Sequence, residues 1–230
     1  VDTDDLELVG RAHERLAMLV SRVQRYGDLD EYNSPTYDGI DLWAIGLWAT
    51  HPPTPAFTDA AGTILPLVSD RIAALYHPGL GVGCGPYLRA YGLDPRRYVS
   101  LSGLLFAGLD EPVDRVLPSP LTPDTDHVHD LYFAPVLDHV APALRPHLRL
   151  ELVTGERHRV QRFRTAVAEH LLRPDLAVGW DRGRRHEASL DQYVPVTAHV
   201  AEPVGDVLAF GIMVPPETAW VDVERTGDRK

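Results

Sequence analysis

The sequence predicts an α+β fold in which helices come first and antiparallel strands follow. Up to about residue 145, apolar residues recur at helical spacing in segments of roughly 10–20 residues. From about residue 147, apolar and polar residues alternate, and turn residues separate the short alternating segments. We therefore expect a domain of helical hairpins over residues 1–145 and an antiparallel, β-rich domain over residues 146–230.

The first expected helix spans residues 4–26. Apolar side chains such as Leu16 and Val23 lie on one stripe of this helix. Asp5 suits the N-terminus, where an acidic side chain accepts hydrogen bonds from free amides. Gly27 follows the last periodic residue, which is typical of a helix C-cap.

Four more helices are expected after the first. They cover residues 42–49, 57–76, 96–108 and 129–145. Pro66 lies inside the second of these, so we expect that helix to kink there or to begin near Leu65. Pro135 and Pro142 are expected to kink or break the last one. Helices of this length joined by loops favour hairpins stacked side by side.

The second part of the chain is expected to form an antiparallel meander. Residues 148–153 and 158–163 alternate apolar and polar side chains around Thr154-Gly155-Glu156, which predicts a hairpin. Residues 165–171 fit either a helix or an irregular strand. The remaining candidate strands are Leu176–Trp180, Tyr193–Val200, Val207–Val214 and Ala219–Glu224.

Composition limits the expected partners. The net charge of −11 argues against nucleic acid or an anionic membrane surface as the main partner. No run approaches the roughly 18 apolar residues of a membrane span, and the N-terminal residues do not resemble a signal peptide. We expect a cytoplasmic protein, or one whose leader has been removed. Cys84 is the single cysteine, which excludes a disulfide within the chain and favours a small buried apolar residue.

Two loops carry the polar and aromatic residues that suggest a functional site. The first covers residues 31–43 and places tyrosines, an asparagine and aspartates around a turn rich in proline and glycine. The second covers residues 77–94 and supplies a histidine, two tyrosines, an arginine and an aspartate. Because loops held by rigid flanking elements are common places for chemistry, we expect the two loops to face each other across one cleft.

A third polar segment follows the second loop. His127 and His129, with Asp124, Asp126 and Asp130, have side chains that could bind a divalent metal. We favour a solvated acidic loop, because short His/Asp clusters in proline-rich loops commonly occur without a metal. No metal ligand and no cofactor is therefore expected, and activity should need no added metal.

The motifs of the two loops resemble those of an uncharacterised protein family. The matching stretches are Glu31–Trp43, His77-Pro78, Gly85–Asp94 and Pro174–Gly179. In architecture that family is similar to the heparinase II/III-like polysaccharide lyases, which have an (α/α) toroid and a β-sandwich. The resemblance implies a shortened, incomplete toroid in the helical part and a β-sandwich-like second part. It also implies β-elimination on a uronate-type saccharide.

Lyase chemistry gives these groups roles. Removing a proton next to a carboxylate requires that the carboxylate charge be neutralised, for which Asn33 and Arg89 are the candidates. Tyr87 and His77 are the candidates for proton transfer, with Tyr91 as the alternative phenol. The residues expected to contact the substrate are Tyr32, Tyr37, Asp41, Trp43, Tyr91 and Asp94.

Other interpretations stay open. The tyrosines and Trp43 could simply pack helices, and Asp41 or Asp94 could cap them. Asn33 is followed by serine, whereas some alginate lyases have histidine there. A second candidate function is therefore a cyclase or isomerase of a small metabolite in an apolar pocket. A third is a carbohydrate-binding module without catalysis, and a homo-oligomer is compatible with every one of these.

Overall fold

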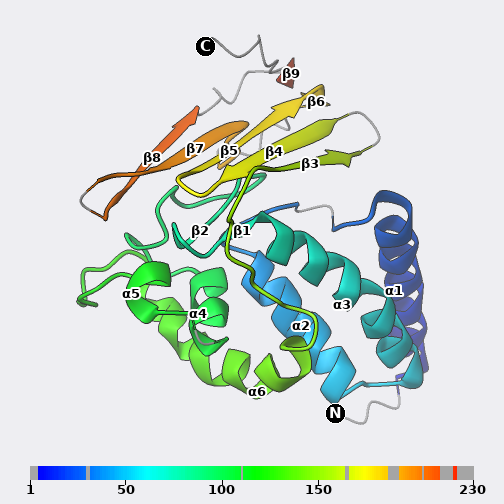
Figure 1. Cartoon of the computed structure of the whole chain (residues 1–230). Helices are drawn as coiled ribbons and strands as arrows, with labels where there is room; N and C mark the ends of the chain where they lie inside the picture. The colour runs from blue at the N-terminus through cyan, green and yellow to red at the C-terminus, as the bar shows by residue number, and fades with distance from the viewer. Residues whose placement is uncertain are drawn as a thin grey trace.

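The computed structural model describes residues 5–29, 32–109, 111–163, 166–185, 192–203, 205–212 and 220–221. In this part of the chain, helices are followed by a five-stranded antiparallel sheet, which confirms the predicted α+β fold (Figure 1). The sheet lies across one end of the helical part, with the loops around β1 and β2 between them. None of the described helices combines the length and apolar character that a membrane crossing requires.

The helical elements are α1 (Leu6–Tyr26), α2 (Asp38–Thr50), α3 (Pro55–Leu75), α4 (Leu101–Gly108), α5 (Val113–Val116), the 3-10 helix η1 (Val128–Phe133) and α6 (Ala134–Leu144). The strands are β1 (Tyr76–His77), β2 (Val82–Gly83), β3 (Arg157–Arg162), β4 (Val167–Arg173), β5 (Leu176–Arg182), β6 (Arg184–Arg185), β7 (Val196–Ala201), β8 (Val207–Ile212) and β9 (Trp220–Val221). β1 and β2 form a short antiparallel pair that the sequence did not predict.

Both ends of α1 follow the sequence signals. The Asp5 carboxylate accepts a hydrogen bond from the Leu8 amide at 3.0 Å. Gly27 has φ = 75°, and its amide donates to the Val23 carbonyl at 2.7 Å. A side chain is strained at such a φ, so glycine ends the helix at low cost.

Of the three prolines expected to kink or break helices, Pro66 and Pro142 lie inside α3 and α6, which continue through them. α3 runs through Pro66 and does not begin near Leu65. The helix expected over residues 129–145 is instead divided into η1 and α6, and Pro135 lies in the first turn of α6. Proline is tolerated there because the first amides of a helix have no partner within it.

The predicted hairpin around residues 154–156 is wrong. Residues 148–153 form no strand, and β3 pairs with β4, so residues 167–171 belong to a strand and not to a helix. Residue 165 lies outside the described residues. Leu148 is buried in the helical core, and Val153 is buried in a second cluster beneath the sheet. Burial of these side chains therefore decides the path of the segment, although its alternating pattern suits a strand.

The main sheet has the strand order β3-β4-β5-β7-β8, each strand antiparallel to its neighbour, as in the predicted meander. The last predicted strand differs, because Trp220–Val221 pairs with β6 outside this sheet, and residues 213, 214, 219 and 222–224 of the predicted strands lie outside the described residues. Its inner face presses closely on the loop after β2. A Cβ atom added to Gly179 in β5 would lie 1.4 Å from the carbonyl oxygen of Gly85. Only glycine at position 179 permits this approach between sheet and loop.

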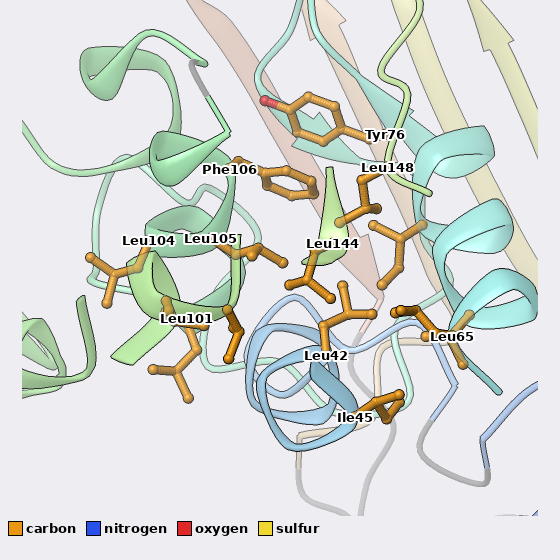
Figure 2. Packing of buried hydrophobic residues seen from close by; sticks show 14 of the residues in the cluster. Leu42, Ile45, Leu65, Tyr76, Leu101, Leu104, Leu105, Phe106, Leu144 and Leu148 are labelled. Carbon is orange, nitrogen blue, oxygen red and sulfur yellow. The ribbon is translucent and has the colours of Figure 1, made fainter. Parts of the chain in front are cut away.

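The main hydrophobic core lies among α2, α3, α4 and α6. α2 packs against the other three helices. Figure 2 shows side chains of these helices converging around Leu42, with Tyr76 and Phe106 stacked at one end of the cluster. Leu42 and Leu144 are completely buried. This core holds the ends of α2 and α4 in place, and these ends border the two loops of interest.

Candidate functional site

The structure brings the two predicted loops together through hydrogen bonds to main-chain atoms. The Ser34 hydroxyl donates to the Arg89 carbonyl at 2.7 Å, and the Tyr91 amide donates to Thr36 Oγ1 at 3.3 Å. Asn33 Nδ2 donates to the carbonyls of Cys84 and Pro86, both at 2.8 Å. Glu31, the first residue of the motif, lies outside the described residues.

Asn33 therefore holds the second loop in position. Its side chain is buried, and φ is 53°, a conformation that asparagine adopts more readily than most residues. Both donor hydrogens of its amide are engaged by main-chain carbonyls. The role predicted for Asn33, neutralising a substrate carboxylate, would require these two bonds to break.

Tyr32 and His170 join the first loop to the sheet. Tyr32 Oη lies 2.6 Å from His170 Nε2, and His170 Nδ1 lies 2.6 Å from the Gly85 carbonyl oxygen. Because a carbonyl only accepts, Nδ1 carries the proton and Nε2 accepts from the phenol. Burial lowers the pKa of His170 to about 3 and raises the pKa of Tyr32. Tyr32 is thus a buried structural donor in this conformation.

The His77 side chain is held by main-chain groups. Its Nδ1 accepts a hydrogen bond from the Leu80 amide at 3.1 Å, and its Nε2 donates to the Arg173 carbonyl at 2.8 Å. The ring is buried at the junction of β1 with the end of β4. Both nitrogens are occupied by main-chain groups, so the geometry gives His77 a structural role.

Tyr87 lines a small internal cavity. The phenol donates to the Gly83 carbonyl, and burial raises the pKa of Tyr87 well above its ordinary value. The cavity volume is about 40 Å³, which is room for about three water molecules. Its lining comprises Asn33, Pro35, Asp38, Ile72, Leu75, Tyr76, Gly81, Gly83, Tyr87, Leu93, Pro95, Tyr98, Ser100, Ser102, Gly103 and Phe106. A saccharide does not fit in this space.

A buried ion cluster that the sequence interpretation missed supports the first loop. The fully buried Arg71 guanidinium contacts Asp28 at 2.8 Å and Asp38 at 2.6 Å. Burial opposes the charge of Arg71, but the two carboxylates raise its pKa above the ordinary value. Burial raises the pKa of Asp38, against the effect of Arg71. The available signal was an arginine next to Ile72 on the apolar stripe of a helix.

The surface beside this framework carries a second group of polar side chains. We call Tyr37, Arg89, Tyr91 and His127 the phenol cluster. Arg89 Nη2 donates to Tyr37 Oη at 3.3 Å, and its guanidinium carbon lies 4.5 Å from the centre of the Tyr37 ring. The two phenol oxygens, of Tyr37 and Tyr91, are 2.9 Å apart. The His127 ring stacks on Tyr91, with 4.0 Å between centroids and planes 3° apart.

The phenol cluster is accessible to solvent. Tyr91 is 38% exposed, whereas Tyr87 is 2% exposed. The hydrogen bond with Tyr37, followed by partial burial, raises the pKa of Tyr91 to about 12. Tyr91 therefore stays protonated at neutral pH and can donate a proton. Of the four residues predicted to be catalytic, Arg89 belongs to this cluster, and so does Tyr91, the predicted alternative phenol.

The other residues predicted to contact the substrate, Trp43, Asp94 and Asp41, make contacts within the fold or lie at a helix end. Trp43 packs its ring edge-on against Phe133 at 5.9 Å, next to the helical core. Asp94 accepts from the Arg96 amide at 3.0 Å and from Arg96 Nε at 2.9 Å. Asp41 lies in the first turn of α2, where a negative charge is favourable. Neither aspartate is the N-cap of a helix, since Tyr37 occupies that position in α2 and Ser100 in α4.

Comparison with known protein families supplies one match. A family model described as a domain of unknown function, DUF8769, matches residues 2–142. The chain belongs to the DUF8769 family. No curated protein and no solved structure matches the chain significantly. The DUF8769 match contains both loops and the whole phenol cluster, and it ends before β3 begins.

The chemistry available to this DUF8769 chain is that of an arginine beside two hydrogen-bonded phenols. The guanidinium can bind an anionic oxygen, and the phenols can accept and donate a proton. The framework of Asn33, Ser34 and Thr36 fixes the loops that carry these groups. The cluster thus combines an anion-binding group and a proton-transferring pair on an open surface.

Proposed function

We propose that the phenol cluster abstracts a proton next to a carboxylate and promotes β-elimination on a uronate-type saccharide. The observation that carries the proposal is the chain of contacts from Arg89 to Tyr37 to Tyr91, at 3.3 and 2.9 Å. This is the set of groups that such an elimination requires, and it faces solvent, where a polymer can reach it.

Each group has a role that follows from its charge and position. Arg89 binds the substrate carboxylate and offsets the negative charge of the enolate-like intermediate. Tyr37 first releases its own phenol proton to solvent, and the Arg89 donor stabilises the resulting phenolate. The phenolate then accepts the α proton and becomes neutral. Tyr91, which is protonated at neutral pH, donates to the leaving glycosidic oxygen. The tyrosine beside the arginine is therefore Tyr37, in place of the predicted Tyr87.

The experiment is an ultraviolet assay for an unsaturated product with uronate polysaccharides of different linkage. We expect Tyr37→Phe and Tyr91→Phe each to lower kcat by roughly 10²–10⁴-fold, the usual contribution of a positioned acid or base. Tyr26→Phe is the matched control, because Arg25 lies over the Tyr26 ring at 5.4 Å elsewhere on the protein. Full activity in both phenol variants would disprove the proposed roles.

The other two functions predict different results in the same assay. A carbohydrate-binding module would bind the polymer at the exposed tyrosines and release no unsaturated product. A cyclase or isomerase would use the internal cavity, and its volume of about 40 Å³ argues against a metabolite of ordinary size in this conformation. The surface position of the arginine and phenols is the reason for preferring the lyase.

A further inference from the structure

A group of possible metal ligands lies next to the phenol cluster, at the start of η1. Asp130 stands between two imidazoles. Its Oδ2 is 3.7 Å from His127 Nδ1, and its Oδ1 is 3.5 Å from His129 Nε2. One ligand atom from each of the three residues can be chosen so that all lie within 4.8 Å of one another.

These separations differ from those of hydrogen bonds. A hydrogen bond from an imidazole nitrogen to a carboxylate oxygen measures about 2.7–3.2 Å, shorter than either contact. Two ligand atoms about 2.1 Å from a tetrahedral ion are about 3.4 Å apart. The observed 3.5 and 3.7 Å end on different oxygens of Asp130, so each is close to the spacing of two ligand atoms on one ion. The three ligand atoms taken one per residue lie within 4.8 Å of one another.

Surrounding contacts hold His127 and the backbone of the loop in place, whereas the His129 side chain is 66% exposed. The His127 ring stacks on Tyr91, and His127 has φ = 58°, which is uncommon for a residue other than glycine. The Asp130 amide donates to the His127 carbonyl at 2.9 Å. The main-chain carbonyl of Asp126, the residue before His127, accepts a hydrogen bond from the Val99 amide at 2.9 Å. This bond connects the loop to the segment that precedes α4. Ligands ordered in this way lose little conformational entropy when an ion binds.

We propose that His127, His129 and Asp130 bind one divalent transition-metal ion of the zinc class. Imidazole and carboxylate ligands suit such ions better than they suit Ca²⁺ or Mg²⁺, which prefer oxygen ligands alone. Three protein ligands leave coordination positions for water or another molecule, as in catalytic zinc sites. The proposal departs from the sequence-based expectation of no metal ligands, and it does not depend on the lyase function.

The test measures metal binding to the whole chain without substrate. The protein is stripped with a chelator and titrated with Zn²⁺ by calorimetry, and with Co²⁺ by visible absorption, which reports the coordination geometry. We expect one equivalent of each ion to bind to the wild type. His129→Ala and Asp130→Asn should each weaken metal binding at least about tenfold. Loss of a residue that only supports a metal ligand already lowers metal affinity by about 10–100-fold.

His158→Ala is the matched control. His158 Nε2 lies 3.5 Å from Glu169 Oε2 on the sheet. The substitution therefore removes another exposed histidine that is paired with a carboxylate. Affinity should stay within twofold of wild type. Because His129 is 66% exposed at its side chain, His129→Ala is expected to fold normally, and circular dichroism would verify this. Absence of binding by the wild type, or unchanged affinity in folded His129→Ala, would overturn the proposal.

Discussion

The phenol of Tyr32 donates a hydrogen bond to His170, and Tyr32 Oη lies 2.6 Å from His170 Nε2. The two residues are 138 positions apart in the sequence. The other ring nitrogen of His170 donates to the Gly85 carbonyl. One neutral imidazole thereby connects the first loop, the second loop and the sheet. Its neutrality makes the assembly sensitive to pH.

Stability should fall in acid because of His170. Burial lowers its folded-state pKa to about 3, whereas the unfolded value is about 6.5. Between these two pH values the unfolded chain binds a proton at His170 that the folded chain does not bind. The contribution of His170 to the free energy of unfolding is therefore fully present above about pH 6.5 and decreases toward pH 3. The expected loss from this residue is about 2–3 kcal/mol between pH 7 and pH 4.5.

Urea unfolding of the wild type and His170→Gln at these two pH values measures this loss. Glutamine has an amide NH₂ group that can donate and a carbonyl oxygen that can accept, and it does not titrate. At pH 7 the variant should have a lower free energy of unfolding than the wild type. Between pH 7 and pH 4.5 its free energy of unfolding should decrease less than that of the wild type. An identical pH dependence in the two proteins would show that His170 does not control acid stability.

Arg71→Met should strongly destabilise the fold. The substitution leaves Asp28 and Asp38 buried without their cation, which typically costs about 3–5 kcal/mol. Arg159→Met is the matched control, since Arg159 contacts the exposed Asp70 at 3.1 Å and a surface pair contributes about 1 kcal/mol or less. Equal midpoints of chemical unfolding for the two variants would contradict the importance of the buried cluster.

Tyr87→Phe should affect stability and leave chemistry largely intact. The sequence predicted an acid/base role for Tyr87, but its phenol donates to a main-chain carbonyl inside the protein. Losing that donor removes a hydrogen bond to a partly buried carbonyl, at a cost of about 0.5–1.5 kcal/mol. The kcat of the folded variant should remain near wild type. A loss of more than about tenfold in kcat at full folding would restore Tyr87 to the reaction.

Arg89→Ala should reveal the charge of the substrate. If Arg89 binds the carboxylate of a uronate, both binding and turnover fall, and an uncharged ester of the same saccharide is affected much less. Calorimetry gives the binding constants, and product absorbance gives the rates. Arg25→Ala, which removes the equivalent arginine from Tyr26, is the control. Equal losses on the charged and uncharged ligands would argue against a carboxylate contact.

Local signals in the sequence were sufficient for most of the elements. Asp5 and Gly27 act within four residues of their own positions, so the ends of α1 follow from neighbouring residues alone. Pro135 likewise sets the start of α6 through its missing amide. The alternation after residue 147 was enough for the meander, although it also suggested a strand at residues 148–153 that does not form.

The site depended on tertiary structure. The phenol that contacts Arg89 is Tyr37, 52 positions away, and not Tyr87, two positions away. Tyr87 and Tyr91 lie four positions apart on the second loop, yet Tyr87 lines the cavity and is 2% exposed, whereas Tyr91 is 38% exposed. Sequence spacing identifies which residues belong to a loop, but packing against the sheet and α2 decides which of them meet, because burial and long-range hydrogen bonds join segments that have no local relation.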